Sequence, residues 1–121
     1  MRLRHSTILL ISLMLSCGKE LPTLNGVDLD KWKDDKNACQ GLRESMGPSL
    51  KMEITKLKGL AEMDIIALLG RPDQNELYTR NQKFYYYFIS PGPACKASDS
   101  SAHKLILRFN AMGYAQLVSI E

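Results

Sequence analysis

The stretch that most constrains the fold is residues 59–89, where a helix pattern stops abruptly and an aromatic strand pattern follows. Apolar residues recur at helical spacing up to Leu69. Gly70 and Pro72 then predict the end of the helix, because glycine accepts the left-handed cap conformation and proline cannot continue the hydrogen-bond ladder. Residues 83–89 (KFYYYFI) predict a strand, since aromatic side chains are enriched in strands. The fold must therefore place a helix and a strand within one short segment.

Two further strands are predicted after the aromatic one. Residues 104–110 (KLILRFN) and 114–121 (YAQLVSIE) have strand-like patterns, and the turn between them contains Gly113. A polar loop with proline and glycine, residues 90–103, precedes them. We therefore expect three antiparallel strands in the C-terminal half of the chain.

The N-terminal half predicts helical structure. Asp28 is a competent N-cap for a helix that carries Trp32 on its apolar stripe, and Gly47 with Pro48 predicts the end of that helix. Residues 49–58 predict an irregular or helical connector. The expected fold class is α+β, with two N-terminal helices packed on a three-stranded antiparallel sheet as a two-layer sandwich.

The N-terminus has the layout of an export signal that ends at Cys17. Arg2 and Arg4 precede an apolar run over residues 8–15, which is far shorter than the roughly 20 residues that span a bilayer. An ordinary secretory cut before Cys17 is disfavoured, because Met14 stands where a small residue is needed. The segment MLSC instead resembles a lipobox, whose cysteine receives a lipid. The alternatives are an uncleaved N-terminal helix and a buried core helix with an incidental cysteine.

This interpretation sets the domain organisation. We expect a signal peptide over residues 1–16, a lipidated Cys17 with a flexible tether over residues 17–27, and a single domain over residues 28–121. The signal carries two of the 16 basic residues, against 13 acidic residues in the whole chain, so the mature protein is nearly neutral. Because it has no cluster of lysine and arginine, we expect no nucleic-acid partner. The expected partner at this end is membrane lipid, through the acyl anchor.

Lipidation of Cys17 would leave Cys39 and Cys95 as an even pair. We expect these two to form a disulfide, which persists outside the cytoplasm. Closing a loop of this length would stabilise the fold by about 4 kcal/mol in the chain-entropy model. The alternative is two separately buried thiols. No metal site is expected, because His103 is the one histidine after the signal and no CxxC spacing occurs.

Several motifs in residues 57–121 together resemble a known family. They are Gly59-Leu60, Asp64-Ile65, Leu69 to Asp73, Tyr85 to Phe88, Leu105 to Asn110, Gly113 and Leu117-Val118. This pattern of a short helix ending in Leu-Gly-x-Pro, an aromatic strand and a Leu-x-Leu-x-Phe strand is similar to that of the SmpA/OmlA family of outer-membrane lipoproteins, also called BamE-like. The chain departs from the family at Ala61, where a capping serine or threonine is usual, so a weaker helix start is expected.

The resemblance implies a part in assembling outer-membrane β-barrels, with the barrel-assembly machinery as the protein partner, or the same fold used for another protein contact. Gly18 replaces the aspartate that retains many lipoproteins at the inner membrane, which favours the outer membrane on its periplasmic side. Lys19-Glu20 faintly resembles a surface-export tag and leaves the leaflet undecided.

Strand alternation gives a candidate contact surface. Leu105, Leu107 and Phe109 share one face of their strand and are expected in the core, and Phe84, Tyr86 and Phe88 are expected beside them. The opposite face would then be open and could contact a protein, because tyrosine and arginine are enriched in interfaces. The candidate residues are Tyr85, Tyr87, Lys104 and Arg108. The alternative is an ordinary amphipathic sheet surface.

Catalytic motifs are absent from the sequence. There is no GxSxG, HExxH or phosphate-binding glycine loop. Asp34 and Asp35 are adjacent, but neighbours on a helix diverge by about 100°. We therefore expect no enzyme and no cofactor apart from the lipid on Cys17. The expected function is a lipid-anchored scaffold or protein-interaction module, and the alternative is a lipid-anchored inhibitor or small-ligand-binding lipoprotein.

Overall fold

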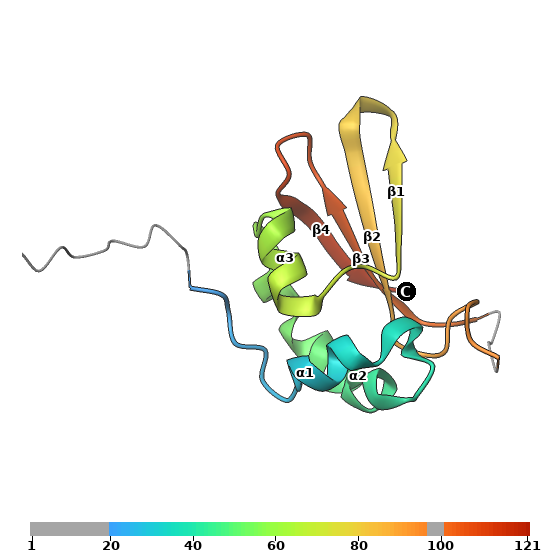
Figure 1. Cartoon of the computed structure of the whole chain (residues 1–121). Helices are drawn as coiled ribbons and strands as arrows, with labels where there is room; N and C mark the ends of the chain where they lie inside the picture. Colours follow the sequence, from blue (N-terminus) through green and yellow to red (C-terminus); the bar gives the residue numbers. More distant parts are fainter. Residues whose placement is uncertain (1–19, 97–100) are drawn as a thin grey trace, which may run out of the picture.

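The computed structural model describes residues 20–96 and 101–121, and Cys17 lies outside these ranges. Within them the helices come first and the strands follow (Figure 1). The α-helices are α1 (Leu29–Asp34), α2 (Leu42–Glu53) and α3 (Glu62–Leu69), with short 3₁₀ helices at Lys36–Ala38, Ile54–Leu57 and Thr79–Asn81. The strands are β1 (Gln74–Tyr78), β2 (Gln82–Phe88), β3 (Lys104–Phe109) and β4 (Ala115–Ile120).

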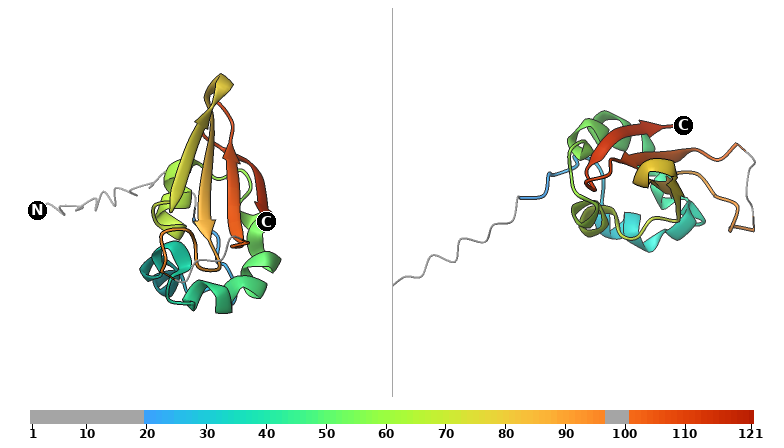
Figure 2. Two further views of the ribbon diagram at one scale, coloured as in Figure 1. Left: turned by 90° about the vertical axis from the view of Figure 1, so that its right-hand side faces the viewer. Right: turned by 90° about the horizontal axis from the view of Figure 1, so that it is seen from above.

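The α+β class is confirmed, with one correction to the strand count. The four strands form one antiparallel sheet in the order β1-β2-β3-β4, and the helices cover one of its faces (Figure 2). Strand β1 was not predicted. Its sequence, QNELY, has no apolar alternation because all five of its residues are exposed. It pairs with β2 across a tight turn over Thr79–Asn81.

The predicted helix end at Gly47 and Pro48 is wrong, because α2 continues through both residues. Pro48 lies on the exposed side of the helix, where the carbonyl that loses its partner can bind water. The break comes earlier, after α1, where Asn37 has a φ of 60° and Gly41 a φ of 78°. Of the two options for residues 49–58, the helical one is confirmed, since α2 and a 3₁₀ helix occupy most of this connector.

Helix α3 ends at Gly70 as predicted. Gly70 has a φ of 79°, and its N–H donates to the Ile66 carbonyl at 2.8 Å. At the other end, Ala61 makes no side-chain cap, as its methyl group requires. The strand turn compensates, because the Glu62 N–H donates to the Gly113 carbonyl at 3.0 Å. A tertiary contact thus replaces the missing local cap.

The core lies between the helices and the sheet. It contains Trp32 from α1 and Leu105, Leu107 and Phe109 from β3, so the predicted core face of β3 is confirmed. Part of the predicted tether also belongs to the core, because Leu24 and Val27 are buried.

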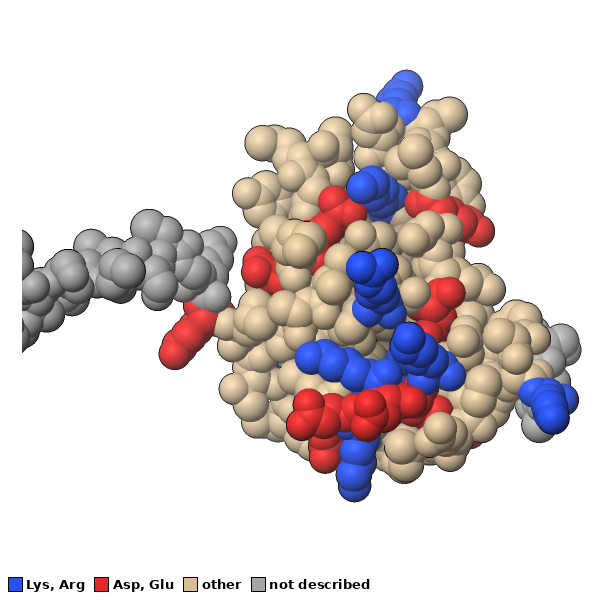
Figure 3. All heavy atoms as spheres, viewed as in Figure 1, with Lys and Arg blue, Asp and Glu red and all other residues tan. Residues whose placement is uncertain are grey.

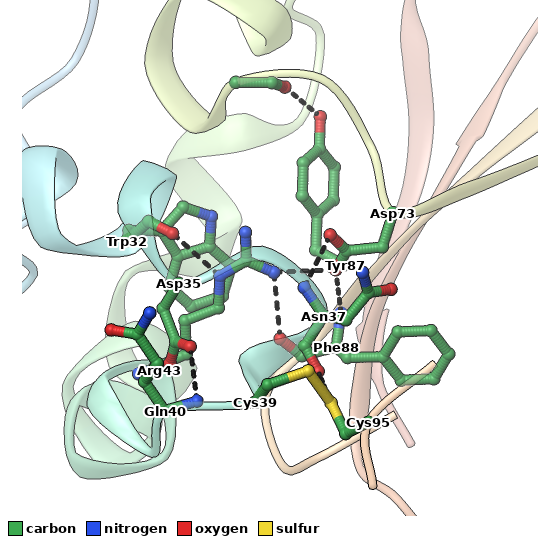
Figure 4. Close-up of polar contacts among 11 residues, drawn as sticks. Trp32, Asp35, Asn37, Cys39, Gln40, Arg43, Asp73, Tyr87, Phe88 and Cys95 are labelled. Carbon is green, nitrogen blue, oxygen red and sulfur yellow. Dashed lines mark hydrogen bonds and ion pairs between the residues drawn. A yellow bond between two sulfur atoms is a disulfide. The ribbon is translucent and has the colours of Figure 1, made fainter. Parts of the chain in front are cut away.

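A buried ion pair joins the helices to the foot of β1. Arg43 of α2 is 1% exposed, and its Nη1 lies 2.6 Å from Oδ2 of Asp73, just before β1 (Figure 4). Nε of Arg43 donates to the Trp32 carbonyl at 2.8 Å, and the guanidinium lies over the Trp32 ring at 4.6 Å. Asp73 also accepts the N–H of Phe88 at 2.8 Å and that of Asn37 at 3.0 Å. The pair therefore ties α1, α2, β1 and β2 together.

The predicted disulfide between Cys39 and Cys95 is confirmed and lies beside this ion pair (Figure 4). It links the segment after α1 to the loop between β2 and β3, with the two Cα atoms 5.3 Å apart. The same loop passes over Phe88, where a Cβ on Gly92 would come within 2.7 Å of the ring. A side chain at residue 92 would push the loop away from the sheet.

Candidate functional site

The four residues of the predicted contact surface do not lie on one face. Tyr85 and Tyr87 point into the core, on the side of the helices, which reverses the predicted faces of β2. Lys104 and Arg108 lie on the opposite, open face of the sheet and are half-buried. The predicted surface is therefore wrong as a single patch.

The reason for the reversal is that tyrosine can bury its ring and still satisfy its hydroxyl. Tyr87 Oη donates to the Gly70 carbonyl at 2.8 Å, and Tyr85 Oη donates to Oε1 of Glu62 at 2.9 Å. Both acceptors belong to α3 or its end. Burial raises the pKa of both tyrosines, that of Tyr85 to about 12 with a further contribution from Glu62. Alternation alone cannot show which face offers such acceptors.

The open face carries a cluster of aromatic side chains instead. Phe84 stacks with Tyr86 at 6.3 Å and meets Tyr78 edge-on at 4.8 Å. Glu76 accepts hydrogen bonds from the hydroxyls of Tyr78 and Tyr86 at 2.7 and 3.0 Å, and these bonds lower its pKa. Lys104 Nζ lies 4.6 Å from the centre of the Tyr86 ring. Tyr86 is 8% exposed and Tyr78 52%, so the aromatic surface is covered only in part, and the buried Nε of Arg108 on the same face has no hydrogen-bond partner among the described residues.

The larger accessible feature is a groove on the helix side of the sheet. Helix α3 is short, so the far half of the β1–β2 hairpin extends beyond it (Figures 1 and 2). Hollows of about 470 Å³ and 350 Å³ lie along this gap, and a third of about 170 Å³ shares lining residues with both. We call this continuous feature the α3 groove. Its lining includes Met63, Ile66, Arg71, Pro72, Asn75, Leu77, Lys83, Tyr85 and Met112.

Three exposed apolar side chains lie along the α3 groove, among polar lining residues such as Glu62, Asn81 and Asn110. Met63, Leu77 and Met112 come from α3, β1 and the β3–β4 turn, and they are 72%, 68% and 82% exposed. Figure 3 shows that charged side chains gather most densely in the lower part of the molecule, over α1, and that fewer of them lie among uncharged side chains in the upper part, over the hairpin. Large apolar side chains from three separate elements are thus exposed along the same groove.

Two cationic side chains, Lys83 and Arg71, line the α3 groove, and they differ in whether a carboxylate pairs with them. Lys83 Nζ lies 3.3 Å from Glu62 Oε1, so its charge is partly balanced. Arg71 is exposed and makes no ion pair or hydrogen bond with the described residues. The groove therefore offers exposed apolar side chains, polar lining residues and an arginine that has no charged partner among the described residues.

A separate hollow of about 420 Å³ lies between α2 and the ends of β2 and β4. Ile89, Ile120 and Pro48 give it an apolar floor, and His103 lies at its edge. His103 has no carboxylate or thiol partner among the residues in the described ranges. Across those same ranges, no group of histidine, cysteine, aspartate or glutamate could hold a metal ion.

Sequence reasoning missed the residues that form the α3 groove. Leu77 is the single aliphatic residue in a polar stretch, Met63 lies between Glu62 and Asp64 at the start of α3, and Met112 lies in the turn between β3 and β4. An apolar residue in an otherwise polar context was the available signal. Arg71 carried no signal, since it follows Gly70 in a turn that already had a structural explanation.

Comparisons with protein-family models, with curated proteins and with solved structures find no match for this chain. In the part of the chain that the structure describes, no helix is long and apolar enough to cross a membrane. The resemblance to the SmpA/OmlA family and the lipidation of Cys17 thus stay predictions from the sequence.

Proposed function

We propose that this chain is a lipid-anchored protein-interaction module on the periplasmic side of the outer membrane, and that it binds its partner through the α3 groove. In line with the family resemblance, the proposed partner belongs to the machinery that assembles β-barrel outer-membrane proteins. The lipid on Cys17 would hold the module at the membrane, and the structure would act by contact alone.

The observation that carries this proposal is the exposure of Met63, Leu77 and Met112 around one open groove. Burying three such side chains against a partner would contribute several kcal/mol, at about 25 cal/mol per Å² of apolar surface. Methionine also adapts its shape to a bound surface, since its chain is unbranched and polarizable. A groove of this composition suits a protein segment better than a small polar ligand.

The disulfide supports the proposed compartment. Cys39 and Cys95 are joined, and such bonds persist in oxidising spaces such as the periplasm. A chain with this bond and an N-terminal export signal is consistent with a folded domain outside the cytoplasm.

The partner is tested by crosslinking in living bacteria. A photoreactive amino acid at Leu77 should capture a component of the barrel-assembly machinery, identified by mass spectrometry. The same amino acid at Met52, which is 82% exposed on α2, is the matched control and should not capture it. Equal capture from both positions, or capture of no component from Leu77, would contradict the proposal.

The anchor is tested separately with Cys17→Ser. Metabolic labelling with a palmitate analogue should mark the wild-type chain and not the variant, and only the wild-type chain should stay with membranes. Labelling of the variant would show that Cys17 is not the lipidated residue.

The second candidate, a small-ligand-binding lipoprotein, has support from the hollow beside His103. Its volume of about 420 Å³ lies within the usual range for small-molecule sites, roughly 300–1,000 Å³. Ile120→Arg would fill this hollow, so it should abolish binding of an apolar dye if the hollow takes ligands. Crosslinking from Leu77 should be unchanged in this variant.

A further inference from the structure

The two outer edges of the sheet differ in whether another segment of the chain pairs with their backbone. The start of β4 is covered, because the Gly59 N–H donates to the Ala115 carbonyl at 2.7 Å and the Ala115 N–H donates to the Leu60 carbonyl at 2.8 Å. Ala61 also forms a β-bridge with Tyr114. On the other side, β1 is the terminal strand of the sheet, and no described segment pairs with its outer edge. The β4 edge is thus paired by the chain at its start, whereas the outer edge of β1 has no such partner among the described residues at any point along its length.

The open edge lacks the usual protection against strand addition. Natural proteins block exposed edges with charged side chains, especially lysine, and with proline, bulges or covering segments. The sequence of β1, Gln74–Tyr78, contains neither lysine nor proline, and its pairing with β2 runs through all five residues without a register shift. Its one charged residue, Glu76, is engaged by the hydroxyls of Tyr78 and Tyr86 on the open face. The backbone of β1 is therefore available to another strand.

A strand added at this edge would have side-chain contacts on both faces of the sheet. On one face its side chains would lie beside Leu77 and extend the wall of the α3 groove. On the other face they would lie beside Tyr78, which is 52% exposed. Alternate side chains of the added strand would thus be buried on opposite faces, which is how strand addition combines backbone affinity with sequence preference.

Charge at this edge indicates the chemistry of the added strand. Arg71 lies three residues before β1, lines the α3 groove and is unpaired among the described residues. A carboxylate on the incoming segment could pair with it. A second copy of this chain is less suited, because antiparallel pairing of two β1 strands centred on Glu76 would place two carboxylates directly opposite each other.

We propose that the free edge of β1 accepts a fifth strand from the partner: an extended segment with alternating apolar side chains and an acidic residue positioned at Arg71. The inference deepens the proposed function, since it describes how the groove would bind a protein. It explains why apolar residues, an unpaired arginine and an unprotected strand edge occur together at one place.

The test uses the isolated full-length chain and the synthetic peptide Asp-Val-Thr-Val-Thr-Val as the probe. Amide hydrogen exchange should slow at Gln74–Tyr78 when the peptide is added, with little change in β4. A twin peptide, N-methylated at the alternate residues whose N–H groups would face β1, cannot donate those backbone hydrogen bonds and should bind about tenfold more weakly or worse. Equal binding of the twin, or protection on β4, would overturn the proposal.

Variants of the protein locate the interaction. Leu77→Lys places a charge on the free edge and should abolish protection by the peptide, whereas Leu117→Lys on β4, also at an exposed leucine, should leave it unchanged. Arg71→Glu should weaken binding of the peptide that begins with Asp. The same variant should bind more tightly a peptide in which Lys replaces that Asp. Protection of β1 that grows with protein concentration in the absence of peptide would show that a second copy is the occupant, and would overturn the proposal.

The outcome is independent of the anchor and of the partner's identity. If Cys17 proves to be unlipidated while the peptide still protects β1, the cellular role fails and the strand addition stands. If the chain is lipidated and crosslinks from Leu77 but the twin peptide binds equally well, the interaction module stands and strand addition fails.

Discussion

The two ends of the β1–β2 hairpin differ in how they are held. At the base, Asp73 and the end of β2 are fixed by the buried Arg43 and by the nearby disulfide. At the tip, Leu77 and Tyr78 are exposed and only the partner strand supports the backbone. The base therefore determines whether the domain is stable, and the tip is free to bind. The difference shows how one strand pair can combine rigid attachment with an unprotected edge.

Loss of the ion pair at the base should have the largest effect. Arg43→Met keeps much of the side-chain volume but leaves the Asp73 carboxylate, 2% exposed, without a counter-charge. Removing one partner of a buried pair typically costs about 3–5 kcal/mol. Urea unfolding should show this loss, and the double variant Arg43→Met/Asp73→Asn should recover part of it. A loss below about 1 kcal/mol would show that the base is not held by this pair.

Removal of the disulfide should rank second. The paired variant Cys39→Ala/Cys95→Ala frees a loop whose ends are separated by 56 positions, and the expected cost is about 2–4 kcal/mol. Chemical denaturation of the variant and of the reduced wild-type chain should give similar midpoints. If the variant matched the oxidised wild-type chain, the covalent link would not contribute to the base.

A side chain at Gly92 should have an intermediate effect. In Gly92→Ala the new methyl would lie 2.7 Å from the Phe88 ring, so the loop must shift away from β2. Overpacking of this kind costs about 1–3 kcal/mol. Ala94→Ser in the same loop is exposed and serves as the matched control. Equal thermal midpoints for the two variants would show that the close approach of Gly92 to the Phe88 ring does not contribute to stability.

The hydroxyl of Tyr85, in the middle of β2, links the hairpin to α3 and gives a pH dependence. Its loss in Tyr85→Phe should cost about 1 kcal/mol at neutral pH, through the bond to Glu62. Burial raises the pKa of Tyr85 from 10.0 to about 12, so its stabilising effect is complete below the lower value and is lost as pH rises toward the higher one. Urea titrations across this range should therefore show a flatter alkaline decline in the variant. If the free energy of unfolding of the variant declined with pH as steeply as that of the wild type, the Tyr85 hydroxyl would not be the source of the alkaline decline.

Changes at the tip should have the smallest effect on stability. Leu77→Lys replaces a side chain that is 68% exposed, and such substitutions usually stay within about 0.5 kcal/mol. The same variant should lose peptide-induced protection of β1. If it unfolded as readily as the Arg43 variant, the tip would be part of the stabilising structure and the contrast with the base would fail.

Local sequence signals predicted the helix end at Gly70, the aromatic strand and the core face of β3, because each depends on a few neighbouring residues. The disulfide was predicted by counting, once Cys17 was assigned to the lipid anchor. The strand β1 was missed because an exposed edge strand does not need alternating apolar residues.

Tertiary structure decided what local patterns could not. No sequence pattern singled out Arg43, and only the fold places it against Asp73 and Trp32. The faces of β2 were reversed for the same reason, since the acceptors for Tyr85 and Tyr87 come from α3 rather than from β2 itself.

The sequence by itself therefore determined the class of fold, the approximate limits of most elements and the cysteine pair, because propensity, capping and parity are local or countable properties. Only the tertiary structure decided which strand edge stays unpaired along its whole length. Only the tertiary structure also decided that Met63, Leu77 and Met112 lie along one groove. Those features depend on the length of α3 relative to the hairpin and on contacts between distant segments, which no single stretch of the chain specifies.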